Sequence, residues 1–498
     1  MLFNSFEFLI FFPVVTVLFF LFPHRFRWSL LLVASCIFYM FFKPVYILIL
    51  AVTIVIDYCA GLLLEREQSL PKKKYILLLS IIANVGFLGI FKYFNFFNHN
   101  ISGLLSVFGY ANAIPYLNIL LPIGLSFHTF QAMSYTIEVY RGNQKAERHF
   151  GIYALYVMFY PQLVAGPIER PQNMLHQFHE RKYIDYQRIA DGLKLMAWGM
   201  FKKVVIADRL SVMVDYVYDQ PKHFQGIPLL LATLFFSFQI FCDFSGYSDI
   251  ALGSAKVMGY DLMVNFRRPY FSASISEFWK RWHISLSTWF RDYLYIPLGG
   301  NRVIKWRWYY NLLLVFIISG FWHGASWNFV IWGALHGIYL IVGIMTENTR
   351  SKFNRVIGLT KFPWLLGTLK ITTTFILVSF AWIFFRAENL SDALYIIKNI
   401  PLGWGRGIHD IISDSLVAFH TRTDILYLGA DFSWFITGIC FILFMEIVHM
   451  IEERRKDNVV NILRAYPAPI RMTLYSCFLV VVVFFGIFSR NQFIYFQF

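Results

Sequence analysis

Long apolar runs recur from one end of this 498-residue sequence to the other, and they constrain its fold more than any other feature. A helix needs about 20 mainly apolar residues to cross the hydrocarbon core of a bilayer. Charged residues make up 15% of the chain, whereas soluble domains carry about 25%. The sequence therefore predicts an all-α polytopic integral membrane protein with about 11–13 membrane helices. The expected spans are residues 6–22, 28–43, 45–64, 75–97, 115–138, 190–218, 228–256, 308–321, 327–345, 371–386, 433–450 and 472–489.

Two further apolar stretches, 151–167 and 276–300, are interrupted by proline, glycine or charge. Irregular backbone at membrane depth is tolerated only where protein or water covers it, so we expect re-entrant or interfacial segments there. The sequence shows no convincing internal repeat. We therefore predict one transmembrane domain over the whole chain. Its expected parts are N-terminal helices in 1–140, a core with the re-entrant segments in 150–345, and C-terminal helices in 371–498.

The basic character of the chain fits a membrane protein better than a nucleic-acid-binding protein. Forty-four Lys and Arg against 29 Asp and Glu give a net charge of 44 − 29 = +15. The basic residues cluster between the apolar runs, as the positive-inside rule expects, and no nucleic-acid motif accompanies them. Placing the basic loops in the cytoplasm predicts that both termini lie outside it. The pair Lys202 and Lys203 fits poorly, because it falls inside the expected span 190–218, which could be a partly interfacial helix.

Several classes of protein are disfavoured by what the sequence lacks. No basic stretch precedes the first apolar run, so we expect that run to remain as an anchor and not to be a cleaved signal peptide. The motifs H-E-x-x-H, G-x-x-x-x-G-K-[ST] and G-x-S-x-G are absent, which disfavours a zinc protease, a nucleotide hydrolase and a serine hydrolase. His176 and His179, beside Glu180, lie in a polar basic loop where we expect solvation and no metal. The cysteines lack a C-x-x-C pair and are predicted to be small buried hydrophobes; they are Cys36, Cys59, Cys242, Cys440 and Cys477.

A polar cluster, Ser319–Asn328, interrupts an otherwise apolar region. It contains His323, and an ionisable side chain at bilayer depth is costly and rarely without a function. Gly320 and Gly324 would let other backbone or a substrate approach closely. Because histidine titrates near neutral pH, His323 is a candidate general base, a role that contributes about 10²–10⁴-fold to a rate. The alternative is a histidine that only makes hydrogen bonds between helices.

A second histidine lies in an aromatic segment, Glu277–Tyr293, that precedes this cluster in the chain. Placed on a helix, the segment puts Lys280, His283 and Ser287 on one face and its large aromatic side chains on another. The pattern also fits an amphipathic interfacial helix with an aromatic belt. His283 and His323 could act as a pair, in which one histidine takes a proton and the other orients or neutralises it. The aromatic residues are Trp279, Trp282, Trp289 and Phe290.

Two other stretches are apolar but unsuited to a plain membrane helix. Tyr160–Pro171 contains three prolines and one glycine, so it cannot form a regular span. We expect a re-entrant hairpin there, either purely structural or forming the wall of a substrate funnel. Phe241–Asp249 carries Asp243 and Asp249, and each carboxylate costs up to about 2.5–3.5 kcal/mol at the bilayer centre. Both should face protein or water, although a hydrogen-bonded helix break would also explain them.

Taken together, these stretches resemble the membrane-bound O-acyltransferase superfamily. The resemblance is closest to its bacterial branch acting on cell-surface polysaccharides, typified by the alginate O-acetylation membrane protein. It covers most of the chain, with five motifs in the family's order. Each motif alone is moderately specific, and their common order makes the resemblance strong. The motifs are Leu121–Gln131, Pro161–Ile168, Asp243–Asp249, Phe278–Ser287 and Trp322–Gly324.

The resemblance implies a role for each histidine. His323 matches the essential histidine of the family's membrane tunnel. His283 takes a second polar position that is asparagine or aspartate in many relatives, which leaves open whether it transfers a proton or positions substrate. The fold implied is a ring of helices around a thin central tunnel, where funnels from both faces meet. Further substrate contacts in the tunnel or funnels are predicted at Gln131, Gln162, Gly166, Pro167, Asp243, Ser245, Trp282, Arg291, Asp292, Trp322 and Asn328.

The implied reaction moves an acetyl group from cytoplasmic acetyl-CoA, as substrate and not as a bound cofactor, to an acceptor outside the bacterial inner membrane. The acetyl group is expected to pass to a separate extracytoplasmic transferase of the SGNH-hydrolase type. Alginate-like exopolysaccharide, cellulose and peptidoglycan all fit as acceptors, and teichoic-acid D-alanylation fits less well. The rival interpretation is a polysaccharide or lipid transporter, a class that often shows internal repeats. Basic residues that could attract the coenzyme's phosphates are Arg170, Arg181, Lys202 and Arg302.

Overall fold

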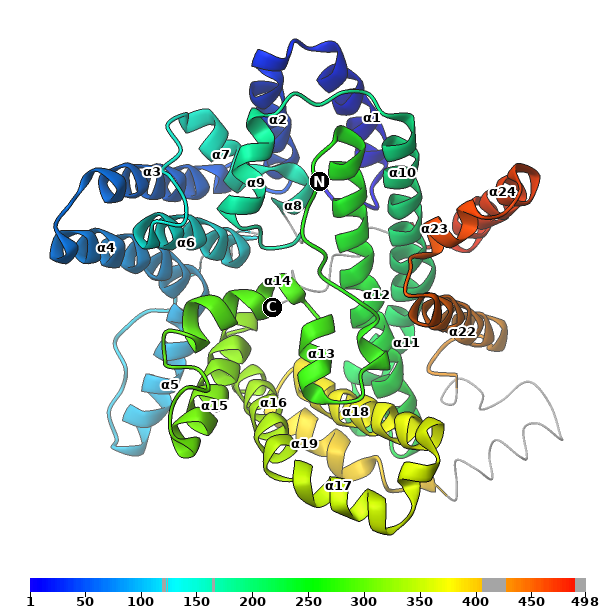
Figure 1. Ribbon diagram of the computed structural model, residues 1–498. Helices are drawn as coiled ribbons and strands as arrows, with labels where there is room; N and C mark the ends of the chain where they lie inside the picture. Colours follow the sequence, from blue (N-terminus) through cyan, green and yellow to red (C-terminus); the bar gives the residue numbers. More distant parts are fainter. Residues whose placement is uncertain (119–121, 123, 164–165, 405–426, 489–498) are drawn as a thin grey trace. The chain divides into compact units, whose positions relative to one another are not determined.

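The computed structural model describes residues 1–498 apart from 119–121, 123, 164–165, 405–426 and 489–498. Every regular element in this described part is a helix (Figure 1). The predicted all-helical, multi-pass membrane class is therefore confirmed, while the other expected spans are shorter or less apolar than a plain crossing requires. Seven of the described helices are long and apolar enough to cross a membrane: Tyr46–Arg66, Leu70–Val107, Ile227–Met258, Trp327–Met345, Pro363–Arg386, Phe432–Arg455 and Ala468–Phe485.

The chain forms two compact units, and two helices run from one unit into the other. The first unit contains Met1–Trp198 and Tyr247–Val264. Its helices are α1 (Phe6–Leu21), α2 (His24–Met40), α3 (Tyr46–Arg66), α4 (Leu70–Leu88), η1 (Gly89–Tyr93), α5 (Phe94–Val107), α6 (Leu125–Arg141), α7 (Phe150–Met158), α8 (Tyr160–Leu163), α9 (Pro171–His179), most of α10 (Tyr186–Met200) and the C-terminal part of α12 (Ile227–Met258).

The second unit contains Gly199–Gly246 and the helices that follow Asn265. Besides the rest of α10 and α12, its helices are η2 (Phe201–Ala207), α11 (Asp208–Tyr218), η3 (Pro221–His223), η4 (Pro269–Phe271), α13 (Ile275–Arg281), α14 (Ile284–Phe290), η5 (Arg291–Tyr295), α15 (Lys305–His323), α16 (Trp327–Met345), α17 (Glu347–Val356), η6 (Leu359–Lys361), α18 (Pro363–Arg386), α19 (Leu390–Asn399), α22 (Phe432–Arg455), α23 (Val459–Arg464) and α24 (Ala468–Phe485).

A buried carboxylate joins two apolar helices of the first unit. Asp57 on α3 is fully buried. Its Oδ1 accepts a hydrogen bond from Ser80 Oγ at 2.6 Å, and its Oδ2 accepts one from Asn84 Nδ2 at 2.9 Å; both donors lie on α4. A buried carboxylate needs such partners, because leaving it unpaired in an apolar surrounding is costly. The pair of helices α3 and α4 is thus fixed in register by polar groups.

The interruption expected in 151–167 is present as a broken helix. α7 ends at Met158, and Phe159 leaves the helical conformation (φ −53°, ψ 112°) before the single turn of α8 begins. Gln131 and Gln162 both donate to the carbonyl oxygen of Tyr156, at 2.5 and 2.6 Å. These bonds occupy a backbone acceptor near the helix end, which would otherwise lack a partner. That the segment is re-entrant stays a prediction.

The expected span 115–138 is wrong in its first part. Residues 115–118 are not helical, residues 119–121 and 123 lie outside the described part, and α6 begins only at Leu125. The sequence explains the late start, because Pro115 and Pro122 cannot donate helical hydrogen bonds. Gly124 then adopts a left-handed conformation (φ 77°) immediately before the helix.

The pair Lys202 and Lys203 is buried within a continuous helical stretch, not placed in a loop. Lys202, one of the residues considered for coenzyme binding, therefore lies in a helix and not in one of the basic loops. Lys202 is 4% exposed, and its Nζ lies 5.8 Å from the centre of the Phe241 ring. The expectation that the cysteines are buried holds only for Cys242, because Cys36 is half-buried and the others are exposed. Exposed apolar helix faces contact lipid in a membrane protein, so a cysteine there needs no protein partner.

Candidate active site

Two glycines place His323 at the end of α15. A side chain carbon on Gly320 would lie 2.2 Å from the carbonyl oxygen of Phe329, and one on Gly333 would lie 2.2 Å from that of Phe316. Both distances are far below van der Waals contact, so α15 and α16 approach backbone to backbone at this crossing. His323 is the last residue of α15, just beyond the contact. Close packing of small residues is a common way to join helices in a membrane.

The side chain of His323 is buried and surrounded by aromatic rings. Ring centres of Trp322, Trp332 and Phe385 lie 4.9, 5.0 and 5.4 Å from its own, each in an edge-to-face arrangement. The three rings come from α15, α16 and α18. The imidazole therefore sits in an apolar, largely water-free environment, in which electrostatic interactions are stronger than in water.

His283 lies at a break between two short helices. α13 ends at Arg281 and α14 begins at Ile284, so the stretch 276–300 is interrupted as expected, but placing all of Glu277–Tyr293 on one helix is wrong. His283 has a left-handed backbone conformation (φ 43°, ψ 56°), which is strained for a residue other than glycine. The face expected to hold Lys280, His283 and Ser287 therefore does not exist.

Asn265 holds this break in place. Its backbone oxygen accepts a hydrogen bond from Ile284 N at 2.9 Å, and its side chain Oδ1 accepts one from Ser285 Oγ at 2.6 Å. Both Asn265 and Ser285 are at most 1% exposed. These bonds satisfy the start of α14, which has no side chain cap of its own at His283. The conformation of His283 is thus determined by a segment that comes before α13 in the chain.

Trp322 brings the two histidines into one aromatic cluster. The ring centre of His283 lies 6.4 Å from that of Trp322, which itself lies 4.9 Å from that of His323. Phe244 on α12 packs edge-to-face on His283 at 4.6 Å. His283 is fully buried. Both predicted catalytic residues and Trp322 therefore lie together in the second unit.

A buried ion triad lies beside Phe244. Lys203 Nζ is 2.6 Å from Asp243 Oδ1 and 2.9 Å from Asp208 Oδ1, and all three side chains are at most 5% exposed. Lys203 belongs to η2, a π-helical stretch, a rare conformation that occurs mostly at functional sites. Gly246 lets α12 approach the neighbouring helix, because a side chain carbon there would lie 2.7 Å from the carbonyl oxygen of Gly199. Asp243 thus has an ionic partner, as its position in an apolar run required.

The other predicted contacts in the second unit fall into two groups. Trp282 is fully buried and stacks on Phe278 at 5.5 Å, and Asn328 donates to the carbonyl oxygen of Ala387 at 2.8 Å. Ser245 is also buried. Arg291 and Asp292, by contrast, form an ion pair with each other at 2.7 Å, and the Arg291 side chain is 59% exposed. The first group is part of the buried interior of the second unit, and the second group lies on its surface.

The four remaining predicted contacts belong to the first unit: Gln131, Gln162, Gly166 and Pro167. The two glutamines share the Tyr156 carbonyl described above. A side chain carbon on Gly166 would lie 2.2 Å from Gln162 Cα, so the chain turns tightly there. The hydrogen bonds of the two glutamines hold the broken segment together. Their part in binding a substrate stays a prediction.

Three residues of the cluster were missed from the sequence: Asn265, Trp332 and Phe385. Trp332 could have been found, because it lies one helical turn after Asn328 and so shares its face of α16. Asn265 and Phe385 had no local signal, because each reaches the cluster only through tertiary contacts. The basic residues considered for coenzyme binding differ in exposure: Arg181 and Arg302 are exposed, Arg170 is half-buried and Lys202 is buried.

Comparison with known proteins identifies the family. Residues 148–380 match the family model for MBOAT, the membrane-bound O-acyltransferase family. The chain is 39% identical over 396 residues to a peptidoglycan O-acetyltransferase of Helicobacter pylori, covering 74% of this chain and 73% of that protein. It is 39% identical over 396 residues to the probable alginate O-acetylase AlgI of Pseudomonas aeruginosa, covering 79% and 73%. A teichoic acid D-alanyltransferase of Streptococcus thermophilus is 31% identical over 268 residues, covering 48% and 62%.

The fold is that of a multi-pass helical membrane protein whose second unit encloses two histidines in an aromatic cluster. With these relatives, the chain belongs to the membrane-bound O-acyltransferase family. It is an O-acyltransferase related to polysaccharide and peptidoglycan O-acetylases. The rival interpretation as a transporter is therefore set aside.

Proposed function

We propose that this chain transfers an acetyl group from cytoplasmic acetyl-CoA to a hydroxyl group outside a bacterial inner membrane, with His323 as the general base. The observation that carries the proposal is the burial of His323 and His283 against the same tryptophan, Trp322, within one compact unit. A buried aromatic shell excludes water, which suppresses hydrolysis of a thioester and strengthens interactions with developing charge.

In the proposed step, His323 takes the proton of the acceptor hydroxyl while the hydroxyl oxygen attacks the carbonyl carbon of the thioester. A carbon–oxygen bond forms and the carbon–sulfur bond breaks. The proton then passes from His323 to the leaving thiolate, so that coenzyme A departs as the thiol and the base is regenerated. His283 steadies the step, either by hydrogen bonding to a reacting group or by positioning the substrate.

The membrane location gives the reaction its physical purpose. Coenzyme A carries several phosphate charges, and moving charge into hydrocarbon is very costly. An acetyl group is small and uncharged, so passing it through protein costs far less. The acceptor hydroxyl is proposed to belong to an extracytoplasmic transferase of the SGNH-hydrolase type, which then acetylates the glycan. The orientation with both termini outside the cytoplasm is part of this proposal.

The acceptor is proposed to be a cell-surface or exported polysaccharide. Support comes from the relatives, since the peptidoglycan O-acetyltransferase and the probable alginate O-acetylase share the same 39% identity with this chain. That equality does not favour one glycan over the other. The match to the teichoic acid D-alanyltransferase covers only 48% of the chain, which makes aminoacyl transfer the weaker candidate.

Purified protein in nanodiscs with radiolabelled acetyl-CoA tests the donor and the base. Wild type is expected to release coenzyme A in the presence of an acceptor, and His323→Ala is expected to lose at least about 10²-fold of that rate. His336→Gln is the matched control, because His336 is also buried in the second unit but is given no role in the reaction. Turnover by His323→Ala at the wild-type rate would show that His323 is not the base. If no form turned over acetyl-CoA even with a partner present, acetyl-CoA would not be the acyl donor.

A second experiment identifies the acceptor. Wild-type nanodiscs are supplied with the candidate extracytoplasmic transferases of the host, and then with alginate, cellulose, peptidoglycan or teichoic acid fragments. Mass spectrometry of the glycans is expected to show a gain of one or more acetyl groups on a single glycan class. A D-alanyl group on teichoic acid, with no acetylation elsewhere, would overturn the polysaccharide O-acetylation proposal.

A further inference from the structure

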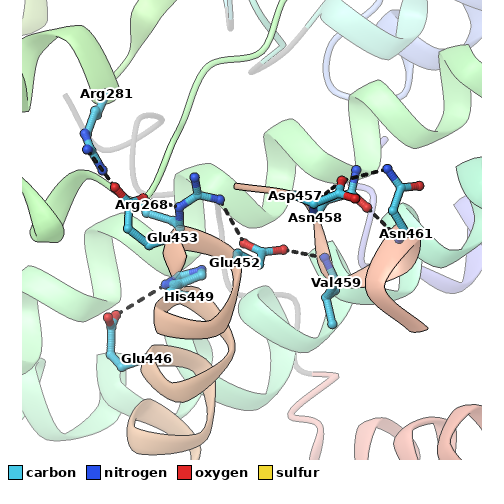
Figure 2. A network of polar contacts seen from close by, with 10 residues as sticks. All are labelled: Arg268, Arg281, Glu446, His449, Glu452, Glu453, Asp457, Asn458, Val459 and Asn461. Carbon is cyan, nitrogen blue, oxygen red and sulfur yellow. Dashed lines mark hydrogen bonds and ion pairs between the residues drawn. The ribbon is translucent and has the colours of Figure 1, made fainter. Parts of the chain in front are cut away.

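The segment that carries His283 is tied to α22 by ion pairs (Figure 2). Glu453 on α22 accepts hydrogen bonds from Arg268 Nε at 2.7 Å and from Arg281 Nη2 at 2.9 Å, one on each carboxylate oxygen. We call these three residues the Glu453 clasp. Arg281 stands just before His283 in the chain, and Arg268 stands just after Asn265. The clasp therefore contacts both of the segments that meet at the break between α13 and α14.

These two segments lie side by side and are strained at two points. Arg267 N donates to the carbonyl oxygen of Arg281 at 2.9 Å, and Ile284 N donates to that of Asn265 at 2.9 Å. Arg268 and His283 both have left-handed backbone conformations, with φ of 48° and 43°. Residues in such conformations persist only when their surroundings over-determine them. The backbone hydrogen bonds join the two segments directly, and the Glu453 clasp joins them a second time through the side chains of Arg268 and Arg281.

The charges of the clasp suit a positioning role more than a stabilising one. The side chains of Arg268, Arg281 and Glu453 are 24%, 20% and 32% exposed, so water weakens each pair. Partly exposed ion pairs contribute little to stability on their own. One carboxylate that binds two guanidinium groups nevertheless fixes their separation, because the two bonds share a rigid acceptor. Arg281 is held further by Glu277, at 2.7 Å on its own helix.

We propose that Glu453 is a positioning residue for acyl transfer, which fixes the break at Trp282–His283 by holding Arg268 and Arg281 together. The inference rests on the proposed function in one respect, since it takes His283 to act in the reaction. Glu453 touches no reacting atom. Its loss lets the break relax, and His283 then leaves the aromatic cluster for part of the time.

The neighbouring carboxylate supplies a matched control. Glu452 pairs with Arg268 at 3.4 Å, and its other oxygen accepts a hydrogen bond from Val459 N at 2.8 Å at the start of α23 (Figure 2). A Glu452→Gln substitution changes the net charge by the same amount as Glu453→Gln, on the same turn of α22. It keeps an oxygen for Val459 and leaves the bond between Arg281 and Glu453 in place.

Two readouts on full-length protein in nanodiscs test the proposal. The first is acetyl-CoA turnover, where Glu453→Gln is expected to lower kcat by about 10- to 100-fold with little change in KM, because a small misplacement at a reacting centre has effects of that size. The second is the rate at which diethyl pyrocarbonate modifies His283, followed by peptide mass spectrometry. This rate is expected to rise several-fold in Glu453→Gln and to stay near the wild-type value in Glu452→Gln.

A His283→Ala background separates positioning from general damage. If Glu453 acts through His283, Glu453→Gln has little further effect on kcat in that background. Equal kcat values and equal His283 labelling for the two glutamine variants would overturn the proposal. If Glu453→Gln does not fold, Arg281→Gln tests the same clasp from its other end. A His283→Ala protein with wild-type turnover would end the role of His283 in catalysis, while increased labelling of His283 in Glu453→Gln would still support the clasp.

Discussion

The two histidines of the cluster are held by different means. His323 ends a helix whose position is set by backbone contact at Gly320 and Gly333, within one pair of neighbouring helices. His283 occupies a strained break. Hydrogen bonds to Asn265 hold this break, and the ion pair between Arg281 and Glu453 ties it to α22. Local packing gives the first histidine a rigid place, whereas the second depends on tertiary bonds that can loosen one at a time. We therefore expect substitutions near His323 to lower stability and turnover together. Substitutions near His283 are expected to lower turnover more than stability.

The largest effect is expected at the ion triad beside Phe244. Lys203→Met leaves Asp243 and Asp208 buried without their cation, which costs about 3–5 kcal/mol of unfolding free energy. Thermal unfolding in detergent should show a lower Tm, and acyl transfer should fall with it. The matched substitution is Lys202→Met, since Lys202 lies against the Phe241 ring and outside the triad. Equal losses for the two variants would show that the triad adds nothing beyond general burial.

The next largest effect is expected at Gly320, where α15 and α16 pack closely and set the position of His323. Gly320→Ala places a methyl group 2.2 Å from the carbonyl oxygen of Phe329, so the helices must separate. Overpacking of this kind costs about 1–3 kcal/mol, and turnover should fall in the same variant because His323 moves. Gly343→Ala, on α16 with open space around it, is the control and should leave both unchanged. A stable but inactive Gly320→Ala would contradict the expected coupling.

Asn265→Ala tests the expectation for His283, which depends on tertiary bonds. The variant leaves the buried Ser285 hydroxyl without its acceptor, which costs about 1–3 kcal/mol. Turnover is expected to fall more than that loss of stability explains, because His283 is no longer fixed. Ser272→Ala serves as control, since Ser272 is equally buried but donates to the carbonyl oxygen of Pro269 in its own turn. A fall in kcat that the loss of stability fully explains would place His283 in the same class as His323.

The smallest effect concerns backbone strain without function. Lys456 follows α22 in a left-handed conformation (φ 54°) and is exposed. Lys456→Gly should raise the unfolding free energy by about 1 kcal/mol, because glycine adopts this conformation without penalty. Lys456→Ala should give no such gain, and turnover should be normal in both. Equal unfolding free energies for the glycine and alanine variants would show that a left-handed residue costs little here. The strain at His283, which has a similar φ, would then also be small.

The sequence was sufficient for the parts of the fold that depend on local pattern. Apolar runs predicted the helical membrane class, and the glycines around His323 predicted a close approach of neighbouring backbone. An interruption in 276–300 was predictable, but its position at His283 was not, because Lys280–Ser285 contains neither glycine nor proline and its aromatic spacing fits a helix. The partners that enforce the break lie outside that segment, since Asn265 precedes α13 and Glu453 belongs to α22 near the other end of the chain.

The charge at Lys203 shows the same limit. Its place inside an apolar stretch is visible in the sequence, but its partners are not. Asp208 begins the next helix along the chain, whereas Asp243 lies on α12, beyond α11 and η3. Pairing across that separation depends on how η2 and α12 pack, and no property of either segment alone specifies it. The aspartates were expected to face protein or water, and Asp243 faces a protein cation.

The length of α12 has a consequence for the depth of this triad. Its 32 residues span about 48 Å at the α-helical rise, while the hydrocarbon core of a bilayer is about 30 Å thick. Asp243 lies at the middle of the helix, equally far from Ile227 and Met258 to within one position. A helix centred in the bilayer would therefore carry this carboxylate to the midplane, and sliding it by one turn in either direction would leave the group in hydrocarbon. The ion pair with Lys203 fixes the register of α12 against η2, because any other register would leave this buried carboxylate without its cation.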